Sequence, residues 1–138
     1  MSTQYVTFTL GENLYGIGVG NVQEVLPYRA TAGVPLAPTD VAGLVNLRGQ
    51  VVLALDLRTR LGLPGREDAE PMMVVVKLGQ EPVSLLVDAI GDVAEVDDEQ
   101  FEAPPQTLSV ELRDVIRGAY KLDGRLLLAL DVDAVTAA

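Results

Sequence analysis

Cysteine and histidine are both absent from this chain of 138 residues. Without cysteine the chain has no disulfides and no thiolate chemistry. Without histidine, the usual nucleophilic triads and most zinc sites also lose their ordinary side chains. No Gly-x-Ser-x-Gly motif is present either. We therefore expect a protein that is not an enzyme and that needs no metal and no cofactor.

Basic residues are scarce. The chain has 10 Lys and Arg against 20 Asp and Glu, which gives a formal net charge of −10. A protein that binds phosphates must bring cations to them, so this balance argues against a nucleic-acid partner. The excess of acids is concentrated in the second half of the chain. Either a basic partner or a solvated acidic face would account for it.

Long apolar runs and an N-terminal targeting pattern are missing as well. The first residues, 1–4, lead directly into the strand-like segment Tyr5–Leu10. The longest apolar stretches are too short to span a bilayer. We expect a cytoplasmic chain with no direct membrane insertion.

The residues that are abundant favour β-structure. Hydrophobic residues make up 49% of the chain and aromatic residues only 4%, and the frequent valines pack well on pleated surfaces. Apolar segments flank short turns in four places: Tyr5–Leu10 with Leu14–Val19, Gly43–Leu47 with Gln50–Leu55, Met72–Leu78 with Pro82–Val87, and Val115–Leu122 with Arg125–Leu130. Each pair predicts a β-hairpin, most strongly at the dipeptide Asp123-Gly124.

Short helical turns are expected between the hairpins. Asn21 can cap a turn over Val22–Val25 that Pro27 would end. Two further stretches, Leu57–Leu61 and Val132–Thr136, each follow an aspartate at the end of a strand.

The order of hairpin, helical turn, loop, hairpin and aspartate occurs twice. Leu10-Gly11 matches Leu78-Gly79, and the run that ends in Asp56 matches the run that ends in Asp131. We predict one all-β domain, residues 1–138, built from two similar five-stranded units over 5–61 and 72–136. Residues 62–71 would link them, with strand exchange between the units left open. Five strands suffice to close a small barrel.

Two acidic features could carry chemistry. Asp56 and Asp131 could form an acid–base pair, although helix capping explains both more simply. The acids between residues 92 and 102 suggest a calcium loop, but they lack the internal glycine and the spacing that such a loop needs. A solvated loop is the better interpretation. These acids are Asp92, Glu95, Asp97, Asp98, Glu99 and Glu102.

Arg48 occupies the turn Asn46-Leu47-Arg48-Gly49. It is either a solvated turn residue or an interface anchor, since arginine combines an apolar stem with a planar set of donors.

Taken in order, these segments resemble the CheW family of chemotaxis coupling proteins. The motifs that carry the resemblance are Leu14-Tyr15-Gly16-Ile17, Val22-Gln23-Glu24-Val25, Asn46-Leu47-Arg48-Gly49, Asp56-Leu57-Arg58 and Leu86-Val87-Asp88. The resemblance implies two intertwined SH3-like barrels. It also implies an adaptor that couples the cytoplasmic tips of methyl-accepting chemoreceptors to the regulatory domain of a CheA-type histidine kinase.

The same resemblance assigns two sets of site residues. The receptor-facing groove between the barrels would comprise Val19, Val22, Glu24, Val87, Ile90 and Val93. The kinase-docking side would comprise Gly43, Leu44, Leu47 and Arg48, with Leu108 near a second kinase contact. By analogy the chain is monomeric alone and assembled in arrays beneath membrane-bound receptors.

Other functions stay open at this point. The chain could couple another chemosensory pathway, such as twitching, gliding or development. It could also be a small peptide-binding β-barrel.

Overall fold

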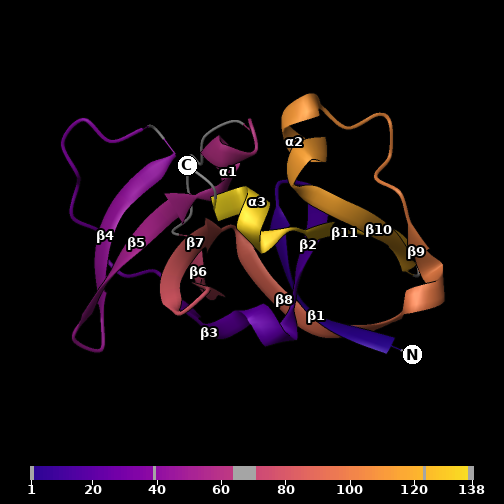
Figure 1. The fold of residues 1–138 in the computed structure, drawn as a ribbon, viewed down its shortest axis with the longest axis horizontal. Helices are drawn as coiled ribbons and strands as arrows, with labels where there is room; N and C mark the ends of the chain where they lie inside the picture. Colours follow the sequence, from indigo (N-terminus) through magenta and orange to yellow (C-terminus); the bar gives the residue numbers. More distant parts are fainter. Residues whose placement is uncertain (1, 39, 64–70, 123, 137–138) are drawn as a thin grey trace.

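A computed structural model describes residues 2–38, 40–63, 71–122 and 124–136. Most of these residues lie in two β-sheets, seen on the right and left of Figure 1. We call the sheet with strand order β8-β1-β2-β11-β10-β9 barrel A, and the sheet with order β3-β6-β7-β5-β4 barrel B.

The strands of barrel A are β1 (Ser2–Leu10), β2 (Asn13–Gly18), β8 (Ala89–Asp97), β9 (Phe101–Glu102), β10 (Ile116–Leu122) and β11 (Arg125–Leu130). The strands of barrel B are β3 (Val22–Pro27), β4 (Val41–Leu47), β5 (Gln50–Asp56), β6 (Met72–Leu78) and β7 (Glu81–Val87). The helical segments are η1 (Val19–Asn21), α1 (Leu57–Arg60), η2 (Asp98–Gln100), α2 (Val110–Val115) and α3 (Val132–Thr136).

The two sheets repeat one topology, as the internal sequence match predicts. Barrel B has the strand order β3-β6-β7-β5-β4. The repeat counterparts of these strands, taken in the same order, are β8, β1, β2, β11 and β10, which is the order found in barrel A. Barrel A adds only the two-residue strand β9 at one edge. The predicted all-β class with internal duplication is confirmed.

Each sheet combines strands from both expected repeat units. The hairpin β1–β2 lies in barrel A beside β8 and β11, while β6–β7 lies in barrel B beside β3 and β5. A parallel pair inside each sheet joins the strands of the two units, with Tyr15 opposite Leu128 and Leu55 opposite Leu85. Barrel B therefore uses the continuous segment 22–87, and barrel A uses chain from both sides of that segment.

Among the described residues, the buried apolar side chains form three cores. The largest lies between the barrels, where α3 sits in Figure 1, and it includes Phe8, Tyr15 and Leu85. Each barrel also encloses a smaller core of its own. Because the central core draws side chains from both sheets, the two barrels pack as one unit.

The four predicted hairpins and the helical turns at Leu57 and Val132 are confirmed. The helical turn predicted over Val22–Val25 is wrong. That segment is β3, which pairs with β6 from Val22 opposite Val76 to Pro27 opposite Met72. Pairing with an apolar neighbour outweighs the local capping signal at Asn21, because strand preference depends mainly on tertiary context.

The solvated loop predicted for the acidic run is also mostly a strand. Residues 89–97 form β8 and pair with β1. Glu95 and Asp97 point outward, whereas the alternate residues Ala94 and Val96 face inward. Acids on one face of an edge strand thus coexist with regular pairing. Of the predicted linker and turns, residues 64–70 and Asp123 lie outside the described residues.

Candidate functional site

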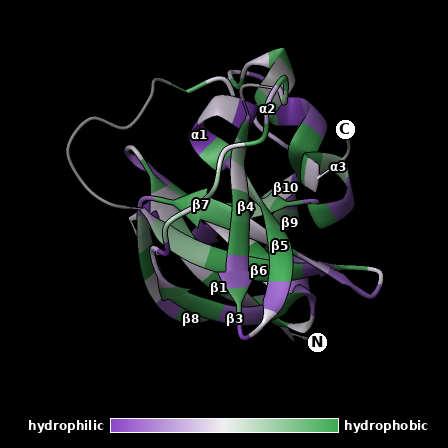
Figure 2. Ribbon diagram, turned by 90° about the vertical axis from the view of Figure 1, so that its left-hand side faces the viewer, coloured by the Kyte–Doolittle hydropathy of each residue, from purple (hydrophilic) through white to green (hydrophobic). Residues whose placement is uncertain are grey.

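Two edge strands, β3 of barrel B and β8 of barrel A, run along the same side of the molecule in both ribbon views (Figures 1 and 2). They are repeat counterparts, and each begins where the chain has just crossed from one barrel to the other. They hold most of the residues assigned to the receptor-facing groove. We call Val19, Val22, Glu24, Ile90 and Val93 the β3–β8 surface.

This surface is apolar and partly open. Val93 is 57% exposed, and Val19 is also exposed. Val22 and Ile90 are half-buried and pack on the core between the barrels. An apolar surface that stands on a rigid core is suited to contact with another protein.

Val87 does not belong to this surface. Its exposed fraction is 0%, and it packs in the central core at the end of β7, opposite Met72. Its repeat counterpart Val19 lies beyond the end of β2, in the turn η1. The two valines therefore differ in exposure because one strand ends a residue earlier than the other.

Val25 is a residue that the sequence assignment missed. It is the repeat counterpart of Val93 and lies exposed on β3. The internal repeat could have identified Val25, because its counterpart Val93 was already assigned to the groove.

Arg48 adopts a left-handed turn conformation. Its φ is 55° and that of Gly49 is 85°, and the Gly49 N–H donates to Asn46 Oδ1 at 3.0 Å. Two successive positive φ angles suit a tight two-residue hairpin, although a non-glycine residue there costs about 1 kcal/mol.

The Arg48 side chain has an internal partner. Its Nη2 lies 3.3 Å from Glu24 Oε1, so the β4–β5 turn contacts the edge strand β3 across barrel B. The side chain of Arg48 is nonetheless 81% exposed. The structure thus joins a residue assigned to the kinase side with one assigned to the receptor side.

A second apolar surface lies on the outer face of β4 and β5. Val51 is 63% exposed, and Leu44 and Leu53 are also exposed. They line a cavity of about 510 Å³ together with Pro82 and Thr136. Figure 2 faces these two strands and shows apolar residues along both. We call Leu44, Val51 and Leu53 the β4–β5 face.

Not all residues assigned to the kinase side present a side chain there. Leu47 is buried in the core of barrel B. Gly43 has a φ of 145°, and a Cβ at this position would lie 2.4 Å from the Ala32 carbonyl oxygen, so its role is structural. Sequence analysis missed Val51 and Leu53, which the outward alternation along β5 could have identified.

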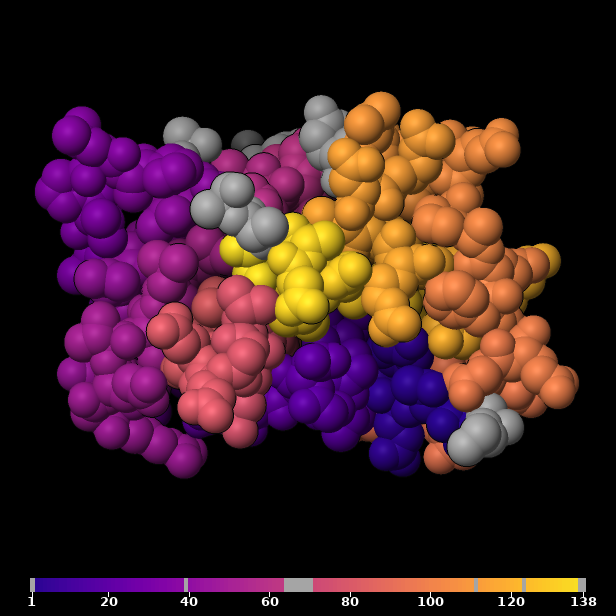
Figure 3. All heavy atoms as spheres, in the orientation of Figure 1, coloured from indigo at the N-terminus to yellow at the C-terminus, as the bar shows by residue number. Residues whose placement is uncertain are grey.

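Leu108 lies away from this face. It precedes α2, is half-buried and packs on the central core. Figure 3 shows the segment around α2 (orange) on the opposite side of the molecule from β4 and β5 (purple).

The two matched aspartates cap helices. Asp56 Oδ1 accepts from the Arg58 N–H at 3.0 Å, and Asp131 Oδ1 accepts from the Ala134 N–H at 3.2 Å. Both carboxylates thus satisfy helix-start amides, as the capping interpretation predicted. Across the described residues, no group of three or more potential metal ligands could hold an ion.

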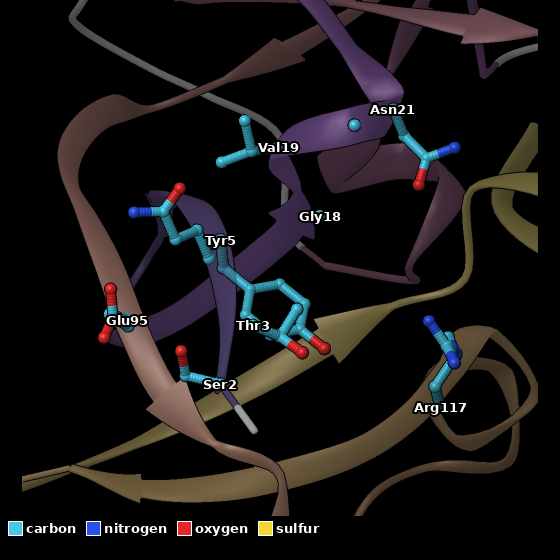
Figure 4. Close-up of a pocket in the computed structure, with 10 residues that line it drawn as sticks. Ser2, Thr3, Tyr5, Gly18, Val19, Asn21, Glu95 and Arg117 are labelled. Atoms are coloured by element: carbon cyan, nitrogen blue, oxygen red, sulfur yellow. The ribbon is translucent and has the colours of Figure 1, made fainter.

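A polar cavity of about 530 Å³ adjoins Val19 (Figure 4). Ser2, Thr3, Asn21, Glu95 and Arg117 line it, with Tyr5 at its wall. The Tyr5 and Tyr120 hydroxyls lie 3.2 Å apart, and burial together with this hydrogen bond raises the pKa of Tyr120. No helix in the described part of the chain is long and apolar enough to cross a membrane.

A family model and similar known proteins point to the same family. The model of the CheW-like domain matches residues 4–138. The chain is 30% identical over 131 residues to the chemotaxis protein CheW of Klebsiella aerogenes, covering 94% of this chain and 79% of that protein. It is 29% identical over 131 residues to the chemotaxis protein CheW of Bacillus subtilis, covering 94% and 84%.

A solved structure agrees with these relatives. The crystal structure of the scaffolding protein TtCheW from Thermoanaerobacter tengcongensis superposes with a TM-score of 0.85 at 28% identity. The match covers 95% of this chain and 90% of that one.

Proposed function

This chain belongs to the CheW-like domain family, and from that premise we propose that it is a non-enzymatic adaptor in chemotaxis signal transduction. It couples the cytoplasmic tips of methyl-accepting chemoreceptors to the regulatory domain of a CheA-type histidine kinase. It works in the cytoplasm as a monomer that joins membrane-associated receptor arrays through its partners. The relatives compared are named for chemotaxis, which favours that pathway over twitching, gliding or development.

The observation that carries this proposal is the presence of two separate exposed apolar surfaces in a chain whose match to the family is nearly complete. An adaptor must hold two partners at once, so it needs two contact surfaces. The β3–β8 surface and the β4–β5 face lie on different strands, and each exposes valine side chains. Exposed apolar clusters of this kind favour protein partners.

The β3–β8 surface is assigned to the receptor. Partly open apolar side chains favour a partner helix, which lays its apolar stripe against such a surface through residues spaced three and four apart. Val19 and Val93 offer open methyl groups, and Val22 and Ile90 form a firmer floor. Glu24 adds a carboxylate at the margin, already paired with Arg48.

The β4–β5 face is assigned to the kinase. Leu44, Val51 and Leu53 project from neighbouring strands, and Arg48 stands at the turn that joins those strands. An apolar patch with an exposed arginine at its edge has the composition of a binding hot spot.

The capping roles of Asp56 and Asp131 support a function without catalysis. Their carboxylates are used by backbone amides, and both sit in equivalent places of a duplicated fold. A pair of caps accounts for both aspartates without a reaction.

Two exposed valines allow a reciprocal test of the two surfaces. Val93→Lys should weaken binding to a chemoreceptor tip fragment by about tenfold or more, while affinity for the kinase regulatory domain stays unchanged. Val51→Lys should do the reverse. Titration calorimetry with each purified partner measures both affinities, and thermal melting confirms that each variant is folded.

Equal losses for both partners from either variant would contradict the assignment of separate surfaces. Failure of the unaltered chain to bind either partner would overturn the adaptor function itself.

A further inference from the structure

The chain crosses between the barrels twice on the way into the β3–β8 surface, and the two crossings are built differently. From β2 to β3 it passes through the three-residue turn η1. From β7 to β8 it passes through a single residue, Asp88, since β7 ends at Val87 and β8 begins at Ala89. The position of Asp88 therefore determines where β8 starts.

Asp88 is held from several directions. Arg58 donates from Nε to Asp88 Oδ1 at 2.8 Å and from Nη2 to Asp88 Oδ2. The Gly11 N–H donates to Oδ2 at 2.8 Å, and the Asp88 N–H donates to the Thr9 carbonyl oxygen at 3.0 Å. A two-point guanidinium–carboxylate contact fixes geometry as well as charge.

These contacts tie both barrels to one residue. Arg58 lies in α1, directly after β5 of barrel B, whereas Thr9 and Gly11 belong to the β1–β2 hairpin of barrel A. The side chains of Arg58 and Asp88 are 18% and 21% exposed, so water screens the pair only in part. The hydrogen bond from the Arg58 N–H to Asp56 in turn holds the start of α1.

In the part of the chain that the structure describes, the other crossing has no comparable side-chain contact. Gly20 is the repeat counterpart of Asp88 and has no side chain to be held. Gly18 precedes η1 without a side-chain cap, and a Cβ at Gly20 would meet nothing within 4 Å. The polar cavity of Figure 4 lies against this turn, at Gly18, Val19 and Asn21. The start of β8 is thus held by side-chain contacts, whereas η1 has open space around Gly20.

We propose that Arg58 and Asp88 are positioning residues for receptor binding, which hold the start of β8 so that Ile90 and Val93 face the partner in a fixed place. The receptor would then meet one preset wall on β8 and one adaptable wall at η1. Neither Arg58 nor Asp88 needs to touch the receptor for this role. The inference rests on the proposed function, because it deepens the receptor assignment of the β3–β8 surface.

Conservative variants test the pair. Arg58→Lys keeps the positive charge and loses the two-point contact, and Asp88→Asn keeps the shape and loses the charge. Arg60→Lys is the matched control. It lies in the same helix, its Nη1 contacts Asp40 Oδ2 at 3.1 Å, and its Nε donates to the Val135 carbonyl oxygen, away from the crossing.

Three measurements are needed for each variant: affinity for a chemoreceptor tip fragment, affinity for the kinase regulatory domain, and amide hydrogen exchange. We expect Arg58→Lys and Asp88→Asn to bind the receptor fragment about tenfold more weakly and to bind the kinase domain as before. Amides of β8 should exchange faster, and those of β4 and β5 should not change. Arg60→Lys should match the unaltered chain in receptor binding and in β8 exchange.

Each other outcome overturns the inference. Unchanged receptor affinity in both folded variants shows that the pair does not position the surface. Equal losses for receptor and kinase, or equal losses in Arg60→Lys, show a general contribution to stability. If the unaltered chain binds no receptor fragment, the proposed function fails and this inference fails with it, an outcome distinct from variants that leave receptor binding unchanged.

Discussion

The two barrels share one strand order but fill their interiors with different side chains. In the alignment that matches Leu10 with Leu78 and Gly49 with Gly124, Tyr5 and Tyr120 of barrel A correspond to Met73 and Val45 of barrel B. At two other positions barrel A has the smaller residue. Gly16 and Gly18 of barrel A correspond to Ser84 and Leu86 of barrel B.

The contacts show why this exchange works. A Cβ at Gly16 would lie 3.1 Å from the Tyr5 Cβ and 3.0 Å from Leu127 Cδ1, so a side chain there would crowd both neighbours. A larger ring at one position is thus matched by a glycine beside it, a substitution pattern that cores tolerate. The common topology therefore depends on strand pairing and turns more than on any particular core residue.

The barrels also differ at one edge. In barrel A, β9 pairs with β10 through Ala119 and Tyr120. In barrel B the strand that corresponds to β10 is β4. No strand pairs with its outer edge in the described residues, and an isolated bridge between Ala32 and Leu44 takes the position of the β9 pairing. The more open edge belongs to the barrel that carries the proposed kinase-docking face.

The largest loss of stability is expected at two equivalent glycines, Gly43 of barrel B and Gly118 of barrel A. Gly43→Ala places a Cβ against the Ala32 carbonyl oxygen at a φ of 145° and should destabilise the fold by about 3 kcal/mol. Gly118→Ala meets the side chain of Phe101, whose ring is partly exposed, as well as the Glu102 carbonyl oxygen. It should cost less, about 2 kcal/mol. Urea unfolding measures both, and a larger loss at Gly118 would contradict the comparison.

The next effect concerns Arg48, whose turn has the acidic Asp123 as its counterpart in the other repeat. Arg48→Ala should reduce affinity for the kinase regulatory domain by about 2 kcal/mol, because arginine at the edge of an apolar patch is a typical anchor. Folding stability should change by less than about 0.5 kcal/mol, since exposed ion pairs contribute little. Calorimetric binding and thermal melting separate the two effects.

Glu24→Gln is the control for this variant. It breaks the pair with Arg48 and leaves the guanidinium in place, so we expect a smaller loss of kinase affinity. An equal loss would show that Arg48 acts through its pair with Glu24, by holding the β4–β5 turn against β3.

A moderate effect should distinguish the tyrosine-lined barrel. Tyr120→Phe removes one of two buried hydroxyls that face each other and should cost about 1 kcal/mol at neutral pH. Burial raises the pKa of Tyr120 above its ordinary value of 10.0. The folded state therefore favours the protonated phenol, and this contribution to stability is complete below pH 10 and is lost as the pH rises further. The alkaline loss of stability should be smaller in Tyr120→Phe, as measured by urea unfolding between pH 8 and about 11.

The smallest effect is expected where the barrels are most alike. Asp56→Asn and Asp131→Asn both keep a capping oxygen, so each should change stability by less than about 0.5 kcal/mol and leave binding of both partners intact. A large loss of coupling in either folded variant would reopen the question of acid–base chemistry.

Local features and the internal repeat were predictable from the sequence, whereas the pairing of individual strands across the repeat was not. The hairpin turns and the caps at Asp56 and Asp131 depend on neighbouring residues, so pattern alone identified them. The segment Val22–Val25 was assigned wrongly because its pairing partner β6 lies fifty or so residues further along the chain. Val87 was assigned to an open groove because the sequence match with Val19 does not show where each strand ends.

In the sequence, the segment that forms barrel B lies between the two parts of the chain that form barrel A. This order has a consequence for synthesis on the ribosome. All strands of barrel B have been made once residue 87 is joined, whereas β2 of barrel A must wait for its partner β11, with Leu14 opposite Leu127. The N-terminal hairpin thus spends most of translation without its final neighbours. We expect barrel B to form first and to serve as the surface on which the two outer parts of the chain later meet.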